Sequence, residues 1–235
     1  MSTIYIVGTP IGNLEDLTFR AFNTLRKVDF VLAEDTRKTK VLLDRYEISK
    51  PIISYHQHSR LTKVDHIIHL LESGKDLVLV TDAGTPGISD PGGFLLEKIW
   101  ESKLKTQSIA PLRDEINIVP IPGVSSVTTI LSVCGFNTDE FLFLGFLPKK
   151  KGRQTLLQDL KKEKRTIVFF ESPFRVKKTL IELEKYFGNI DVVVGRELTK
   201  KFEEVIRGEL VEVIKKIESK NPKREFVVVL NNSSK

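Results

Sequence analysis

Residues 82–93 form the segment of this chain that is best suited to binding chemistry. They read Asp-Ala-Gly-Thr-Pro-Gly-Ile-Ser-Asp-Pro-Gly-Gly and follow an apolar run at 77–80. This pattern predicts a buried strand that is followed by a loop. Glycine lets the backbone approach a ligand or adopt positive φ, whereas proline fixes φ and removes an N–H donor. A tight strand-to-helix connection needs only two or three turn residues, so this composition favours a ligand-binding loop over a plain connection.

The polar groups in and near this loop suit a small molecule with an amino-acid or nucleoside group. Backbone amides and carbonyls of residues 82–90 can hydrogen-bond such a ligand, and the Asp82 carboxylate can pair with an ammonium. Ile88 and Val124 can contact a ring. Ser125 and Ser126 precede a helical pattern, where a hydroxyl can receive a ligand carboxylate or simply cap the helix.

Other chemistries lack the residues that they need. There is no Gly-x-x-x-x-Gly-Lys-[Ser/Thr] sequence, and Gly8 and Gly12 do not have the spacing of a dinucleotide-binding loop. The four histidines lie between residues 56 and 69 and Cys134 is the one cysteine, which disfavours a zinc site. No Gly-x-Ser-x-Gly sequence surrounds a nucleophilic serine. We expect neither a metal nor a covalent intermediate.

Strands and helices alternate along the first half of the chain, and they must position these groups. Apolar runs predict strands at residues 4–7, 28–33, 51–54 and 77–81, separated by amphipathic helices near 17–27, 61–73 and 93–104. Alternation of this kind is typical of a parallel sheet covered by helices. Because right-handed crossovers bring the carboxyl ends of parallel strands to one edge, the loops at 8–13, 34–37 and 82–93 should converge.

The second half of the chain predicts another α/β domain. Its expected strands are residues 117–121, 141–147, 166–170, 191–195, 202–206 and 226–230, with 202–206 antiparallel to 191–195. Residues 106–116 lack periodicity, so we place the domain boundary there. The prediction is thus an α/β protein with an N-terminal domain at 1–115, built on a mainly parallel sheet, and a C-terminal domain at 116–235, built on a mixed sheet.

The charge of the chain is distributed unevenly between these halves. Residues 1–115 carry 15 basic and 16 acidic side chains, a net of −1, whereas residues 116–235 carry 22 and 15, a net of +7. This asymmetry indicates either a polyanionic partner such as nucleic acid or a lysine-rich solvated surface. No signal peptide or membrane span is apparent, so we expect a cytoplasmic protein without membrane contact.

A series of motifs in this chain resembles one known family. They lie at residues 5–13, 33–37, 82–92, 120–123, 145–148, 170–175 and 195–200. In this order they are similar to the ribosomal RNA small subunit methyltransferase I family, which belongs to the tetrapyrrole methylase-like, class III methyltransferases. The resemblance extends over nearly the whole chain.

The resemblance implies a fold, a cofactor and a reaction. It implies two α/β domains with S-adenosylmethionine (SAM) in the cleft between them, usually in a homodimer, and 2′-O-methylation of a cytidine ribose in the decoding centre of 16S rRNA. The implied cofactor contacts are Pro10, Asp82, Ala83, Gly84, Ile88, Ser89, Asp90, Ser125, Ser126, Leu147, Ser172 and Pro173.

Methyl transfer to a ribose hydroxyl mainly requires alignment of the acceptor oxygen, and a nearby base would help. Glu34, Asp35, Glu171 and Glu197 are the carboxylates at or near strand ends. We favour Glu34 or Asp35 as the base or its orienter, with Arg37 orienting a carboxylate or gripping a phosphate. The alternative is that Glu34 and Asp35 only cap the helix that begins around Thr36. The expected RNA contacts are Lys149, Lys150, Lys151, Arg153, Arg175, Arg196, Lys200 and Lys201.

The chain departs from the family pattern at three positions. Phe174 stands where histidine is expected, Val124 where proline is usual, and Arg224 where glycine is usual. Two other functions stay open at this stage. One is a methyltransferase that acts on a tetrapyrrole, and the other is a ribosome-assembly factor that binds SAM or RNA without catalysis.

Overall fold

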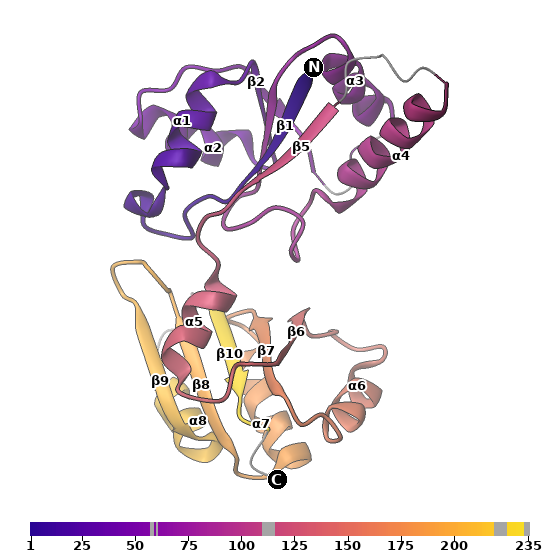
Figure 1. Ribbon diagram of the computed structural model, residues 1–235. Coiled ribbons are helices and arrows are strands. Elements are labelled where there is room, and N and C mark those ends of the chain that lie inside the picture. Colours follow the sequence, from indigo (N-terminus) through magenta and orange to yellow (C-terminus); the bar gives the residue numbers. More distant parts are fainter. Residues whose placement is uncertain (57–58, 60, 110–115, 219–224, 233–235) are drawn as a thin grey trace. The chain divides into compact units, whose positions relative to one another are not determined.

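A computed structural model describes residues 1–56, 59, 61–109, 116–218 and 225–232. The chain divides into two compact units, Met1–Ser125 and Ser126–Lys235 (Figure 1). Arg224, one of the departures from the family pattern, lies outside the described residues.

The first unit is built on a five-stranded sheet in which every pair of neighbouring strands is parallel. Its strands are β1 (Ser2–Val7), β2 (Phe30–Ala33), β3 (Ile52–Ser54), β4 (Leu77–Val80) and β5 (Ile116–Ile121) in the order β3-β2-β4-β1-β5. β5 pairs with β1 along its whole length, from Ser2–Ile116 to Val7–Ile121. The unit therefore ends after β5, whereas the boundary expected from the sequence lies before it.

Helices cover both faces of this sheet. They are α1 (Phe19–Lys27), α2 (Thr36–Arg45), α3 (Leu61–Glu72) and α4 (Gly93–Ile109), with a short 3₁₀ helix at Leu14–Asp16. Val78 and Val80 share a buried cluster with residues of α1 and α2, whereas Leu77 and Leu79 share one with residues of α3 and α4. Burial on both faces explains why the strands read as continuous apolar runs. α4 continues to Ile109, through residues for which the sequence predicts no helix.

The second unit is built on a mixed five-stranded sheet, as predicted. Its strands are β6 (Phe141–Phe146), β7 (Thr166–Glu171), β8 (Asp191–Arg196), β9 (Glu204–Glu209) and β10 (Phe226–Leu230) in the order β6-β7-β10-β8-β9. β6 and β7 are parallel and the other pairs are antiparallel. The helices are α5 (Ser126–Cys134), α6 (Arg153–Leu160), α7 (Val176–Phe187) and α8 (Leu210–Glu218). A core of residues from α6, α7 and α8 fills one face of this sheet.

No helix in the described ranges is both long enough and apolar enough to cross a membrane.

Candidate active site

The carboxyl ends of β1, β2 and β4 bring three polar segments together in the first unit, which confirms the predicted convergence. Thr9 and Gly84 exchange backbone hydrogen bonds, with N···O distances of 2.9 Å and 3.1 Å. The Asp35 N–H donates to Asp82 Oδ1 at 3.0 Å. The loop after β4 is thus tied to the segments that follow β1 and β2.

The loop after β4 has a backbone that few residue types can adopt. Gly84, Gly87 and Gly92 have φ values of +81°, +83° and +138°. Ser89 has φ of 60°, which is unusual for a residue with a Cβ and marks local strain. A Cβ on Gly87 would meet no atom of the described residues within 4 Å. The loop therefore presents exposed backbone groups beside open space, as a ligand cradle requires.

Two glycines let backbones touch next to this loop. A Cβ on Gly123 would lie 2.6 Å from the Gly8 carbonyl oxygen, and a Cβ on Gly8 would lie 2.9 Å from Gly123 Cα. Such distances exclude any side chain at either position unless the backbone moves. This close approach fixes the segments that leave β1 and β5.

Asp35 acts as the cap of α2, the alternative that the sequence left open. Its Oδ1 accepts from the Arg37 N–H at 2.9 Å, and its two oxygens pair with the Arg37 guanidinium at 3.0 Å and 2.7 Å. These hydrogen bonds from Arg37 hold the Asp35 pKa far below its usual range. An ionised carboxylate engaged in this way is a poor proton acceptor.

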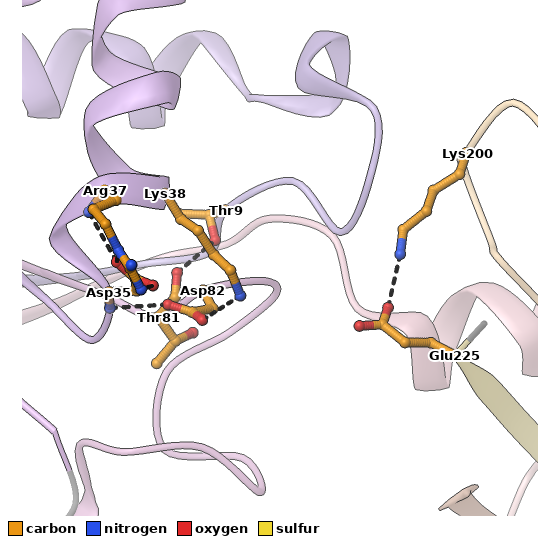
Figure 2. Close-up of polar contacts among 8 residues, drawn as sticks. All are labelled: Thr9, Asp35, Arg37, Lys38, Thr81, Asp82, Lys200 and Glu225. Carbon is orange, nitrogen blue, oxygen red and sulfur yellow. Dashed lines mark hydrogen bonds and ion pairs between the residues drawn. The ribbon is translucent and has the colours of Figure 1, made fainter. Parts of the chain in front are cut away.

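Asp82 lies between α2 and the end of β2 (Figure 2). Lys38 Nζ pairs with Asp82 Oδ2 at 2.5 Å, while Oδ1 receives the Asp35 N–H. Thr9 Oγ1 donates to the carbonyl of Thr81, the residue before Asp82, at 3.3 Å. These contacts hold the Asp82 carboxylate in a fixed orientation.

Glu34 and Asp90 hold protons more tightly than ordinary carboxyl groups. Burial and then the nearby charge of Asp82 raise the pKa of Glu34. Burial, followed by the charges of Glu34 and Asp82, raises the pKa of Asp90 to about 6. The three side chains, here called the carboxylate set, therefore place an excess of negative charge at this edge of the sheet. The pKa of Glu34 is thus shifted toward neutrality, whereas the pKa of Asp35 is shifted away from it.

A small pocket of about 70 Å³ opens beside Asp82. Thr9, Pro10, Lys38 and Thr81 are among the residues that line it. Thr81 is buried, and its hydroxyl has no hydrogen-bond partner within the described part of the chain. An orphaned buried hydroxyl beside a carboxylate and an ammonium can receive a polar ligand group.

Thr9, Lys38 and Thr81 were not among the residues selected from the sequence. Two of them carry a weak signal: Lys38 lies one helical turn after the α2 cap, and Thr81 directly precedes Asp82. Their role depends on contacts between segments more than 40 positions apart, which spacing alone does not reveal.

In the second unit, Glu171 and Arg153 belong to one buried polar network. Glu171 pairs with Arg175 at 2.6 Å and accepts from Thr179 Oγ1 at 2.7 Å. Arg153 donates to Thr179 Oγ1, to Glu182 Oε2 and to the Pro148 carbonyl, at 2.9, 2.7 and 2.9 Å. Each of the three guanidinium nitrogens of Arg153 thus donates a hydrogen bond within the protein. The side chain therefore does not offer the direct phosphate contact that the sequence suggested. Glu171 is equally unsuited to the role of base.

The other expected RNA contacts fall into two groups. In the first group, Arg175 pairs with Glu171, and the buried Arg196 pairs with Glu204. Lys200 pairs with Glu197 and with Glu225, the latter at 2.9 Å (Figure 2). The remaining lysines are exposed: Lys149, Lys150, Lys151 and Lys201.

The residues of the second unit that the resemblance assigns to the cofactor have distinct surroundings. Leu147 is buried and its carbonyl accepts from Arg175 NH1 at 3.3 Å, while the Ser172 N–H donates to Glu171 Oε1 at 2.7 Å. Ser126 begins α5. Phe174, where the family pattern has histidine, is 82% exposed.

Comparison with known proteins places the chain in a family. The model of the Tetrapyrrole (Corrin/Porphyrin) Methylases matches residues 3–214. The chain is 46% identical over 231 residues to the ribosomal RNA small subunit methyltransferase I of Thermotoga maritima, covering 98% of this chain and 99% of that protein. The chain belongs to this family of methyltransferases. The protein of the same name from Bacillus subtilis is 43% identical over 235 residues, which are 100% of this chain and 76% of that protein.

Solved structures show the same fold in more distant enzymes. Cobalt-precorrin-4 methyltransferase superimposes with a TM-score of 0.66 at 19% identity, over 97% of this chain and 94% of that one. Uroporphyrin-III C-methyltransferase from Thermus thermophilus superimposes with a TM-score of 0.65 at 17% identity, over 98% of this chain and 95% of that one. At these identities the similarity concerns the fold alone.

SAM is the methyl donor of this methyltransferase, and the first unit has the chemistry to hold it. SAM carries positive charge on its sulfonium and its ammonium. The carboxylate set supplies negative charge, and burial followed by the charges within the set raises the pKa of Glu34 and of Asp90. The positive-φ glycines after β4 supply accessible backbone groups. Within the described residues, no cluster of three or more His, Cys, Asp or Glu side chains could hold a metal ion.

Proposed function

We propose that this methyltransferase transfers a methyl group to the 2′-oxygen of a cytidine ribose in the decoding centre of 16S rRNA. The observation that carries the proposal is the similarity, along almost the entire chain, to proteins named ribosomal RNA small subunit methyltransferase I. The choice of the cytidine 2′-oxygen rests on the motif resemblance of the sequence. The proposal includes action in the cytoplasm, where a bacterial small subunit is found, and a homodimer.

In this proposal, SAM supplies a methyl group that is already activated by positively charged sulfur. The chain then has three tasks, which are to bind the donor, to align the acceptor oxygen and to accept its proton. Asp82, Ala83, Gly84, Ile88, Ser89 and Asp90 would contact the donor from the loop after β4, and Pro10 from the segment after β1. Ser125, Ser126, Leu147, Ser172 and Pro173 remain proposed donor contacts from later in the chain.

We assign to Glu34 the role of the base that accepts the proton of the ribose 2′-hydroxyl. Its raised pKa brings a carboxylate closer to the acidity of the group that it must deprotonate, and general base catalysis contributes about 10²- to 10⁴-fold. Asp35 and Arg37 are positioning residues in this scheme, because their mutual pairing fixes the start of α2. Alignment of the acceptor along the axis of the donor lowers the barrier by more than the base does, by about 7–11 kcal/mol.

The test of the proposal uses small ribosomal subunits that lack this methylation. Incubation with methyl-labelled SAM should transfer label to the 16S rRNA, and heat-inactivated protein should transfer none. Titration with uroporphyrinogen, followed by absorbance and label transfer, separates the tetrapyrrole alternative. Label on the tetrapyrrole and none on the RNA would overturn the proposal, and binding of SAM without any transfer would favour a non-catalytic assembly factor.

A further inference from the structure

A hollow of about 450 Å³ lies in the second unit, between residues 148–152 and the first turns of α6 and α7. Its lining includes five basic residues, namely Lys149, Lys150, Arg153, Arg175 and Lys178, together with the acidic residue Glu182. A space of this size holds a nucleotide-sized group. Here it is called the basic hollow.

The charges around the basic hollow are only partly compensated. Arg153 pairs with Glu182, and Arg175 pairs with Glu171. Lys149, Lys150 and Lys178 are exposed, and none of them forms an ion pair with a carboxylate in the described part of the chain. Three lysine ammonium groups therefore face this hollow without a protein counter-charge, which favours an anion.

The buried Arg153 network fixes the shape of the basic hollow. Arg153 joins the Pro148 carbonyl to Thr179 and Glu182 of α7, so the segment that carries Lys149 and Lys150 is held against that helix. The lysines therefore project from a rigid frame rather than from a free loop. Arg153 acts here as a positioning residue and not as a contact.

Helix ends add to the positive potential. α6 follows Gly152, which has φ of +78° and no side chain to cap the helix, and Arg175 makes no side-chain cap hydrogen bond to α7. First-turn residues of both helices line the hollow. The amino ends of helices carry partial positive charge and favour phosphate oxygens.

We propose that the basic hollow binds the phosphate backbone of the rRNA substrate, with Lys149, Lys150 and Lys178 each contacting a phosphate. The inference rests on the proposed function and deepens it, because it selects one anchoring point within the basic second unit. It adds Lys178 as an RNA contact and separates Lys149 and Lys150 from Lys200, which is already paired with two carboxylates.

The test measures rRNA affinity of the full chain over a range of salt concentrations. Each phosphate contact contributes about 0.7–0.9 to the slope of log affinity against log salt. Lys178→Ala should reduce the slope by about one, and Lys149→Ala/Lys150→Ala by about two. Lys185→Ala is the matched control, since Lys185 is exposed in the last turn of the same helix and does not line the hollow. It should leave the slope unchanged.

Two further measurements separate the possible failures. Calorimetry with SAM should give wild-type affinity for every variant, because the substitutions are made outside the proposed donor contacts. Slopes for Lys178→Ala and the double variant that equal that of Lys185→Ala, in a protein that still methylates rRNA, would overturn the inference alone. Pyrophosphate binding that depends on Lys178, with the rRNA slope unaltered, would assign the hollow to a free phosphate compound and would also overturn it. A wild-type protein that transfers no methyl group to rRNA would instead refute the proposed function.

Discussion

At the scale of residues, Glu34 is the side chain on which the proposed chemistry depends most. We expect Glu34→Gln to lower the single-turnover rate of methyl transfer by about 10²- to 10⁴-fold, the range for loss of a general base. The affinity for SAM should fall much less than the transfer rate, because glutamine keeps the shape of the glutamate side chain and the carboxylates of Asp82 and Asp90 are retained. A transfer rate within about threefold of wild type would exclude Glu34 as the base.

Asp90 offers a test of the charge around the site. Its pKa, raised from 3.8 to about 6 by burial and by the charges of Glu34 and Asp82, means that ionisation is harder in the folded than in the unfolded chain. The free energy of unfolding of the wild-type protein, relative to that of Asp90→Asn, should therefore decrease as the pH rises from about 4 to about 6. Above about pH 6 the difference between the two proteins should stay constant. Since Asp90 is only partly buried, solvent screening reduces the difference to about 1 kcal/mol at pH 7–8.

The measurement for Asp90→Asn is urea unfolding without SAM, followed through Trp100. This side chain is the single tryptophan of the chain and lies in α4, so its fluorescence reports on the first unit. Equal stability of the variant and wild type at pH 4 and a more stable variant at pH 8 are expected. A variant that is less stable than wild type at pH 8 would contradict the raised pKa of Asp90, which burial and then the charges of Glu34 and Asp82 produce.

The sequence identified Glu34 and Asp35 as neighbours of similar chemistry but did not distinguish their roles. The difference arises from local geometry in one case and from a distant segment in the other. Asp35 pairs with Arg37 within the first turn of α2. The pKa of Glu34, in contrast, is raised in part by the charge of Asp82, which the pairing of β2 with β4 brings near. Only the fold supplies the second relationship.

At the scale of elements, the contact between Gly8 and Gly123 determines how β1 and β5 lead into their loops. Gly123→Ala places a Cβ 2.6 Å from the Gly8 carbonyl oxygen, and backbone on both sides limits relaxation. We expect the free energy of unfolding of the first unit to fall by about 2–3 kcal/mol. Trp100 fluorescence in urea measures it.

Gly93→Ala is the control for that substitution. Gly93 begins α4, and an added Cβ would meet no described atom within 4 Å, so its effect should be neutral or stabilising by up to about 1 kcal/mol. Equal changes in the free energy of unfolding for Gly123→Ala and Gly93→Ala would contradict the close approach of the Gly8 and Gly123 backbones.

The Arg153 network should be the main polar support of the second unit. Arg153→Met leaves Glu182 without its ion pair and releases the Pro148 carbonyl, so we expect a loss of about 2–4 kcal/mol. Arg165→Met, which breaks the more exposed pair with Glu163, should cost at most about 1 kcal/mol.

Circular dichroism in urea checks this pair of variants, with Trp100 fluorescence as the internal reference for the first unit. Arg153→Met should shift the ellipticity transition more than the fluorescence transition. Indistinguishable shifts for Arg153→Met and Arg165→Met would show that the buried network contributes no more than a surface pair.

Sequence periodicity predicted most elements of both units, because their helices bury regular apolar faces. It missed the last residues of α4, where no such apolar repeat exists. It also grouped Arg153 with the lysines before it, since Lys-Lys-Lys-Gly-Arg reads as one basic tract. The separation appears only when α7 supplies Thr179 and Glu182 as partners.

At the scale of the whole molecule, the two units carry different parts of the proposed function. The first holds the carboxylate set and the cradle after β4, and the second holds the basic hollow. The charge difference between the halves of the sequence favours either this division or a lysine-rich solvated surface on the second half. The expected boundary at 106–116 rests on a sequence without periodicity, whereas β5, which begins at Ile116, pairs with β1 more than 100 positions earlier in the chain.

The most direct test is the identity of the methylated nucleoside. Undermethylated small subunits are incubated with methyl-labelled SAM and either wild-type protein or Glu34→Gln, and the 16S rRNA is digested and analysed by mass spectrometry. The proposal predicts label in 2′-O-methylcytidine for wild type and at least about 100-fold less for Glu34→Gln. Label on a base, on another nucleoside or on no nucleoside with the wild-type protein would contradict it.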